Sequence, residues 1–281
     1  MKAKICFLIL LGLCCVGFQG HSAEKLKPET VVAKHLESLA PPEVRAKIQS
    51  RLMAGTVLAN FRLGGSGQIQ GEARLAFQGP KSLIAMLFGA LDYPHEKIAY
   101  NGVDLTVANI SPGVRSQLCQ FLYVHPELFK AGLITGALSP GWALLDPSYR
   151  NAKLQYSGLR KIDNRPVHEL KFRPNKGTDF TISLFFEDGT FRHVRSVYSL
   201  TVSAMMGARP EDSAQLRETR NRLVEDFSDF QPEGRWMLPH QYKLQLSMEG
   251  QARTILFDWA LVLSRFIFDV PLQDTDFNVA N

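Results

Sequence analysis

Seven histidines are the residues of this sequence best suited to catalysis or metal binding near neutral pH. No His-Glu-x-x-His motif occurs, and no histidine is spaced with cysteines as zinc ligands are, so the sequence predicts no metal site. His168 and Glu169 are adjacent in an extended run and should point to opposite faces of a strand, which argues against an acid–base pair. We expect His193 and His240 at the surface or the rim of the fold.

A glycine-rich stretch, Gly64-Gly65-Ser66-Gly67, is the other place where a reactive group could lie. It does not meet the Gly-x-Ser-x-Gly pattern of a nucleophile elbow, and it lacks the Gly-Lys-Ser/Thr end of a phosphate-binding loop. We therefore expect no catalytic residue, no metal and no cofactor, and a protein that is not an enzyme. A secreted hydrolase is the least favoured alternative.

The first 23 residues have the order of a secretory signal peptide. Lys2 and Lys4 precede an apolar run over residues 5–18, and small or polar residues follow up to Ala23. That run is short for a membrane span, so a retained anchor is the less favoured interpretation. We expect residues 1–23 to be removed, and residues 24–281 to form a single periplasmic half-barrel domain.

Cysteine use and charge limit the remaining classes of protein. Cys6, Cys14 and Cys15 lie in the segment to be removed, so Cys119 has no partner for an internal disulfide, and its apolar neighbours predict burial. The formal net charge is +5, with Lys and Arg scattered among acidic residues. This distribution lacks the basic stripe of a nucleic-acid-binding protein, and we expect no nucleic acid as partner. We expect a monomer.

Helical spacing occurs at the start and in the middle of the mature chain. Residues 28–39 have apolar side chains at helical spacing, and Pro41-Pro42 ends that run before a second short helix through about Gln49. In the middle, Ser111 and Pro112 are expected to begin a third helix with one apolar stripe. The stretch that follows is apolar but broken by glycine and proline, as in a helix and loop that cover an apolar surface.

The other runs alternate with a period of two, which is typical of strands. Asn101-Gly102 predicts a tight hairpin between residues 98–100 and 105–107. We count about ten or eleven strands, joined mostly by short turns, which is the pattern of a long antiparallel meander. The expected fold class is mainly β with helices (α+β), in which the helices cover the concave side of a curled sheet.

Several runs, taken in order, resemble the outer-membrane lipoprotein-sorting superfamily, which includes the periplasmic lipoprotein carriers LolA and LolB and the related LppX. The resemblance rests on residues 55–59, 71–77, 97–102, 167–172 and 226–230 within a layout that begins with a helix pair. It covers essentially the whole mature chain as pattern and order. It implies an incomplete antiparallel β-barrel whose open side is covered by helices, with acyl chains bound between the two.

The resemblance also implies which residues would meet the ligand. Ten apolar residues of the expected strands are candidates for the cavity wall: Val57, Ala59, Phe61, Leu75, Phe77, Phe180, Ile182, Leu184, Leu244 and Leu246. Five residues of the middle segment are candidates for a lid: Val114, Leu118, Phe121, Leu122 and Leu133. In the family a barrel arginine holds the lid closed by hydrogen bonds, and Arg74 and Lys81 lie near that region. The sequence leaves open which strand face points inward.

Together these features predict a protein of the cell envelope that binds or carries the acyl chains of a lipid or lipoprotein, with an envelope protein as a further partner. The alternative is an interaction or sensor module that uses the same scaffold with a filled core. Periodicity does not separate the two, because a cavity wall and a solid core have the same apolar pattern.

Overall fold

The computed structural model describes residues 26–62, 66–147, 151–175, 177–202, 218–249 and 254–279. The predicted signal peptide, residues 1–23, lies outside these ranges, as do Gly64 and Gly65 of the glycine-rich stretch. Within the described ranges, no helix is both long enough and apolar enough to cross a lipid bilayer.

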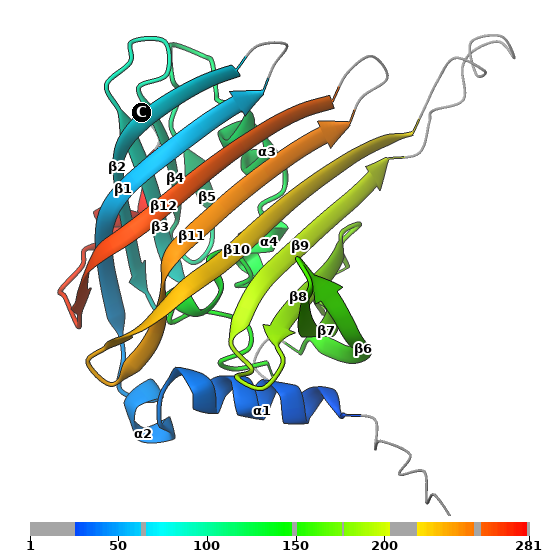
Figure 1. The fold of residues 1–281 in the computed structure, drawn as a ribbon. Coiled ribbons are helices and arrows are strands. Elements are labelled where there is room, and N and C mark those ends of the chain that lie inside the picture. The colour runs from blue at the N-terminus through cyan, green and yellow to red at the C-terminus, as the bar shows by residue number, and fades with distance from the viewer. Residues whose placement is uncertain are drawn as a thin grey trace, which may run out of the picture.

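Twelve antiparallel strands form one curved sheet (Figure 1). The strands are β1 (Ser50–Arg62), β2 (Ser66–Gln78), β3 (Lys81–Phe88), β4 (His95–Tyr100), β5 (Leu105–Val107), β6 (Lys153–Ile162), β7 (Arg165–Arg173), β8 (Thr181–Glu187), β9 (His193–Val202), β10 (Thr219–Glu233), β11 (Trp236–Glu249) and β12 (Thr254–Phe268). Their order in the sheet is β5-β4-β3-β2-β1-β12-β11-β10-β9-β8-β7-β6. The sheet is open, and β5 and β6 are its two edges.

Strands that are neighbours in the sheet are also neighbours in the sequence, with one exception. β1 pairs with β12 in the middle of the sheet, in a register that places Leu58 opposite Ala260. Along β11, the buried residues Tyr242, Leu244 and Leu246 alternate with more exposed ones. The alternation arises because successive side chains of a strand point to opposite faces. It gives the sheet one apolar face, which is concave.

Four α-helices accompany the sheet: α1 (Pro28–Leu39), α2 (Pro42–Arg45), α3 (Gln117–Val124) and α4 (Glu127–Lys130). Two short 3-10 helices, η1 (Gly136–Leu138) and η2 (Asp274–Phe277), complete the described elements. α1 lies across the lower end of the half-barrel, where it contacts β6 and β11 (Figure 1). Its buried face consists of Val31, Val32, His35 and Leu39, so this helix closes one end of the apolar interior.

The chain between the two sheet edges fills the concave side. After β5 it passes through α3, α4 and η1 before it returns to the sheet at β6, and we call its described residues 108–147 the lid segment. Leu118, Leu133, Leu138 and Leu144 of this segment are fully buried against the sheet. The core of the molecule therefore lies between the sheet and its own connecting segment.

The expected fold class is confirmed, with differences in detail. The sheet has twelve strands and not ten or eleven. The third helix begins at Gln117 and not near Ser111, because the Ser116 hydroxyl caps it by accepting a hydrogen bond from the Cys119 N–H, 3.0 Å away. The hairpin at Asn101-Gly102 is present but has a four-residue loop, since the Asn101 side chain accepts the N–H groups of Val103 and Asp104.

Candidate functional site

The ten candidate wall residues all belong to or pack against the apolar core. Nine are buried, and Phe61 is half-buried near the upper end of the sheet. Phe180 contacts the lid residue Phe121, with ring centroids 6.1 Å apart. Phe180 therefore faces the lid segment, and the other buried candidates belong to the same core cluster. The wall residues are covered by that segment, so the interior behind them is filled with side chains.

Four of the five candidate lid residues are buried: Leu118, Phe121, Leu122 and Leu133. Val114 is 49% exposed and lies in the turn that precedes α3, where it bridges to Ser111. Cys119 is a buried free thiol, as expected. The apolar stripe of α3 thus begins at Leu118, one turn later than the sequence suggested.

A buried arginine of β1 holds the far end of the lid segment. Arg51 donates hydrogen bonds from Nη1 to the carbonyl oxygens of Ala137 (2.9 Å) and Leu138 (2.7 Å). Its guanidinium lies over the rings of Trp236 and Phe268, and burial lowers its pKa to about 9. The side chain therefore remains a cation near neutral pH although it is completely buried.

Arg51 corrects the expectation that placed this role near Arg74 or Lys81. Arg74 is exposed and pairs with Glu72, and Lys81 pairs with Asp274 of η2, outside the concave face. The signal in the sequence is position along the strand. Arg51 is two residues from the buried Met53, so it points to the same face as the core residues.

A buried glutamate of β10 holds the middle of the lid segment. Glu225 accepts the N–H of Thr135 at Oε1 (2.7 Å), together with the hydroxyl of Tyr242 (2.6 Å), while the hydroxyl of Tyr198 reaches Oε2 (2.6 Å). Burial raises the pKa of Glu225 to about 7, although these three donors act in the opposite direction. As with Arg51, the position along the strand identifies this residue, because Glu225 is two residues from the buried Leu223 and two from the buried Phe227.

A second buried carboxylate holds the start of the lid segment. Glu96 of β4 accepts hydrogen bonds from Tyr93, Ser116 and Cys119, the last at 2.9 Å from the sulfur. Burial raises its pKa and that of the Cys119 thiol. Since Ser116 also caps α3, Glu96 fixes the first turn of that helix to the sheet. The thiol is thus held in its protonated form, which removes the nucleophile that a reactive cysteine needs.

Two histidines are buried in the lower part of the core, which corrects the expectation of a surface position for His193. The His193 ring stacks on Trp142 of the lid segment with centroids 4.7 Å apart, and His35 of α1 meets Trp142 edge-on at 5.0 Å. Burial lowers the pKa of His35 to about 4 and that of His193 well below its ordinary value. Both rings are therefore neutral core residues. His240 is mostly buried beside Phe266.

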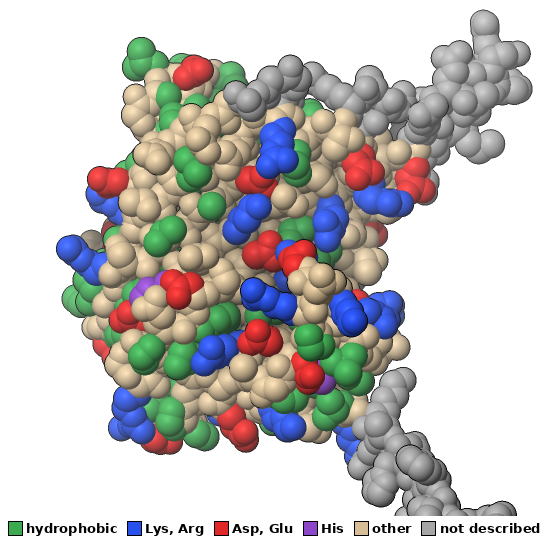
Figure 2. Space-filling model, viewed as in Figure 1, with side chains coloured by type: hydrophobic (Ala, Val, Ile, Leu, Met, Phe, Trp, Pro, Cys, Tyr) green, Lys and Arg blue, Asp and Glu red, His purple; other side chains and the backbone are tan. Residues whose placement is uncertain are grey.

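Other candidates for chemistry also have structural partners. His168 and Glu169 point to different neighbours: the His168 ring meets the Tyr156 hydroxyl, and Glu169 meets Arg160 and Ser183. No group of three or more metal-ligating side chains occurs among the described residues. The convex face mixes cationic and anionic side chains without a stripe of one sign (Figure 2).

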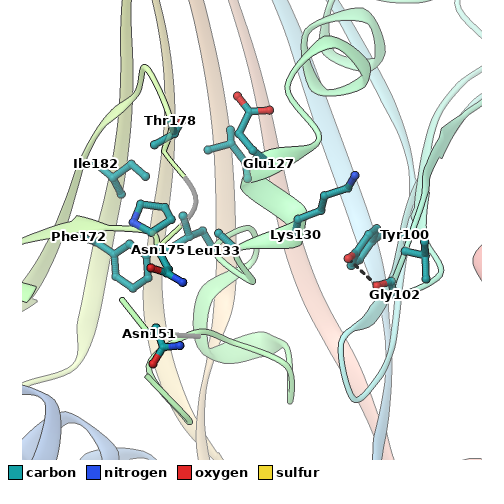
Figure 3. A pocket seen from close by; sticks show the side chains of 14 residues that line it. Tyr100, Gly102, Glu127, Lys130, Leu133, Asn151, Phe172, Asn175, Thr178 and Ile182 are labelled. Carbon is teal, nitrogen blue, oxygen red and sulfur yellow. Dashed lines mark hydrogen bonds between the residues drawn. The ribbon is translucent and has the colours of Figure 1, made fainter. Parts of the chain in front are cut away.

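A cavity of about 500 Å³ lies at the open side of the half-barrel. Figure 3 shows α4 between its two walls, with Tyr100 and Gly102 on one side and Phe172, Ile182 and Thr178 on the other. Of the candidate wall and lid residues, Ile182 and Leu133 line it. The complete lining is Tyr100, Gly102, Val103, Glu127, Leu128, Lys130, Ala131, Leu133, Asn151, Phe172, Pro174, Asn175, Thr178 and Ile182.

The lining is amphipathic. Leu128, Leu133, Phe172 and Ile182 are buried apolar residues, whereas Glu127 and Lys130 are polar groups of α4. A volume of this size is in the range of small-molecule sites, which are mostly apolar with a few polar groups. The arrangement suits an amphiphile with one hydrocarbon part.

The fold and the site define a class: an open antiparallel half-barrel whose concave face is covered by its own connecting segment, which buried polar side chains attach to the sheet. No family model and no curated protein matches the chain. Similar solved structures exist, however. A LolA superfamily protein from Nitrosomonas europaea is similar over 90% of this chain and 98% of its own, with 14% identity and a TM-score of 0.48.

Two further structures are similar over a comparable share of the chain. A putative outer membrane lipoprotein-sorting protein domain from Vibrio parahaemolyticus covers 90% of this chain and 97% of its own, with 10% identity and a TM-score of 0.45. The Mycobacterium tuberculosis lipoprotein LppX covers 88% and 99%, with 10% identity and a TM-score of 0.24. These similarities concern the arrangement of the chain and not its activity.

Proposed function

We propose that this protein binds the hydrocarbon chain of a lipid or lipidated protein at the open side of its half-barrel, without catalysing a reaction. The observation that carries this proposal is the cavity of about 500 Å³ lined by Leu128, Leu133, Phe172 and Ile182. It lies at the one side of the sheet where strands do not close the structure.

Burial of hydrocarbon supplies the affinity. Each methylene removed from water contributes roughly 0.8 kcal/mol, so ten methylenes give about 8 kcal/mol before the cost of ordering the chain. The lid segment, which connects the two sheet edges, covers the concave face. We propose that a long acyl chain enters by displacing part of this segment, which would expose the candidate wall residues.

The test compares two alanines in the same local structure. Ala131 lines the cavity and is the residue after α4, whereas Ala46 is the residue after α2 and is exposed. Ala131→Phe should fill part of the cavity, and losing about two buried methylenes predicts roughly tenfold weaker binding of dansylundecanoate. Ala46→Phe should bind as the unmodified protein does. Equal binding by both folded variants would remove the cavity as the site.

The cellular setting is part of the same proposal. The signal-like residues 1–23 support export to the periplasm, and we propose that residues 24–281 act there as one monomeric domain. An envelope protein that delivers or receives the lipid would be a natural partner. Native mass spectrometry of protein purified from cells tests this setting, because a carrier should retain a co-purified lipid.

The filled-core alternative also has an observation in its favour. Leu75, Leu184, Leu244 and Leu246 are at most 1% exposed, so the wall is solid in this state. An interaction or sensor module would keep this core filled with its own side chains. That module would neither bind dansylundecanoate nor carry a lipid from cells, and these two results together would favour it over the carrier.

A further inference from the structure

The central turn of the lid segment, residues 133–138, is an unusual piece of backbone, and we call it the lid turn. Thr135 has φ 68° and Gly136 has φ 48°, so two successive residues are left-handed. A β-branched residue rarely adopts this conformation, because its side chain crowds the backbone. Surrounding contacts must therefore hold the lid turn in place, and Glu225 supplies one of them through the Thr135 N–H.

Tyr198 of β9 connects the same carboxylate to a second atom of the lid turn. Its hydroxyl lies 2.6 Å from Glu225 Oε2 and 3.1 Å from the carbonyl oxygen of Leu133. A phenol has one hydrogen to donate, so at any moment it serves one of these two acceptors. The protonation state of Glu225 decides which acceptor receives it.

We propose that Glu225 and Tyr198 form a proton-controlled latch on the lid turn. When Glu225 is protonated, its O–H donates to the Tyr198 oxygen, and the Tyr198 O–H donates to Leu133. When Glu225 is ionised, the carboxylate takes the Tyr198 hydrogen, and the Leu133 carbonyl loses that donor. This deepens the proposed function, on which it rests, by naming what regulates access to the hydrocarbon site.

The sign of the pH dependence follows from burial. The pKa of Glu225 is about 7 beneath the closed lid, and water reaching the carboxylate in an open state returns it toward the ordinary value of 4.5. The closed state therefore binds the proton more tightly, and opening becomes easier as pH rises from about 4.5 to about 7, by at most about tenfold per pH unit. Above that window both states are ionised, and the dependence ends.

Other titratable groups surround the latch. Tyr242 of β11 donates to Glu225, and Asp226 of β10 raises its pKa from the opposite face of the strand. His193 of β9 lies against Gly136, and Arg51 of β1 holds Ala137 and Leu138. The histidine becomes charged more easily once the lid is open, so it acts in the opposite direction at low pH. His193 is present both in the unmodified protein and in a Glu225 variant, so comparing the two cancels its contribution to the pH dependence of lid opening.

The experiment measures hydrogen exchange of peptides that cover the lid turn, corrected for intrinsic rates, and needs no lipid. Glu225→Gln has the hydrogen-bonding pattern of the protonated acid and should remain latched. We expect similar exchange in the two proteins near pH 5, and at least about tenfold faster exchange of the unmodified protein near pH 8. If the ratio of the exchange rates of the unmodified protein and Glu225→Gln were the same at both pH values, the proposal would be overturned.

Two tyrosines provide a matched pair of variants. Tyr198→Phe removes the only described hydroxyl that reaches both Glu225 and Leu133, so the lid turn should exchange faster than normal even near pH 5. Tyr242→Phe removes a hydroxyl that reaches Glu225 and not the lid, so exchange near pH 5 should stay unchanged. Faster exchange in both variants, with circular dichroism showing folded protein, would mean that the contacts are merely structural.

Binding of dansylundecanoate by the same proteins separates this latch from the proposed function. A pH-dependent lid turn without probe binding would leave the latch standing and remove the carrier function. Probe binding by a protein whose lid turn exchanges independently of pH would support the carrier function and remove the latch.

Discussion

Three ionisable residues, Arg51, Glu96 and Glu225, point into the apolar side of this sheet and all of them meet the lid segment. Burying a charged group costs several kcal/mol unless hydrogen bonds compensate it. Leucine at these positions would make a simpler core. Their contacts with backbone atoms and the helix cap of the lid segment instead specify where that segment lies.

His35 predicts how the stability of the fold responds to acid. Its pKa is about 4 in the fold and 6.5 when unfolded, so the unfolded chain binds the proton more tightly. The neutral ring of His35 therefore contributes its full stabilisation of the fold above pH 6.5, and this contribution is lost as pH falls toward 4. When the pH is lowered from about 7 to about 5, the free energy of unfolding should fall by roughly 2 kcal/mol less in His35→Asn than in the unmodified protein. Urea unfolding measures this difference.

His125→Asn is the control for that measurement, because His125 is a half-buried residue at the end of α3 whose ring meets Phe121 and Phe180. Glu225 contributes with the opposite sign in the same pH range, but it is present in every protein compared. If His35→Asn and His125→Asn lost the same free energy on acidification, the buried neutral state of His35 would be wrong.

Among the elements, the central pairing of β1 with β12 depends on one small residue. Gly55 lies at a bulge in β1, and a Cβ there would come within 1.9 Å of the Val262 carbonyl oxygen. Gly55→Ala should therefore push the two strands apart and lower the free energy of unfolding by about 2 kcal/mol or more.

Gly67→Ala in β2 is the matched substitution for comparison. A Cβ at Gly67 meets only the Phe61 side chain, at an ordinary 3.7 Å. Urea unfolding should find this variant within about 0.5 kcal/mol of the unmodified protein. If the two alanine variants had equal free energies of unfolding, the pairing of β1 with β12 would not depend on the missing side chain at Gly55.

Elements with a clear period were predictable from the sequence, and their ends were not. The strand alternation around Leu244 and the helix after Pro28 follow from side-chain spacing alone. The start of α3 depends on Ser116 meeting Glu96, which are 20 positions apart, and no local pattern contains that contact. The apolar pattern does not identify Arg51 and Glu225, because charged residues usually face water, although each lies two residues from a buried apolar residue of its strand.

At the scale of the molecule, the lid segment and the sheet share one core, so they should unfold together. Trp142 reports on the lid segment, whereas Trp236 and Trp259 belong to the sheet. In a protein with Trp236→Phe and Trp259→Phe, fluorescence follows the lid segment and far-ultraviolet circular dichroism follows the sheet. We predict coincident urea midpoints, as expected for one cooperative unit. A fluorescence change well before the loss of strand signal would show that the lid segment unfolds on its own.

The two edges of the sheet are joined by the same stretch of chain that covers its hollow side. A ligand that pushed β5 and β6 apart could flatten the sheet by small changes at each of the eleven junctions between neighbouring strands. Each junction then rotates only slightly, yet the sum alters the outline of the outer surface. If the proposed ligand acts in this way, loaded and empty molecules would differ in shape on the convex side, which the ligand does not touch.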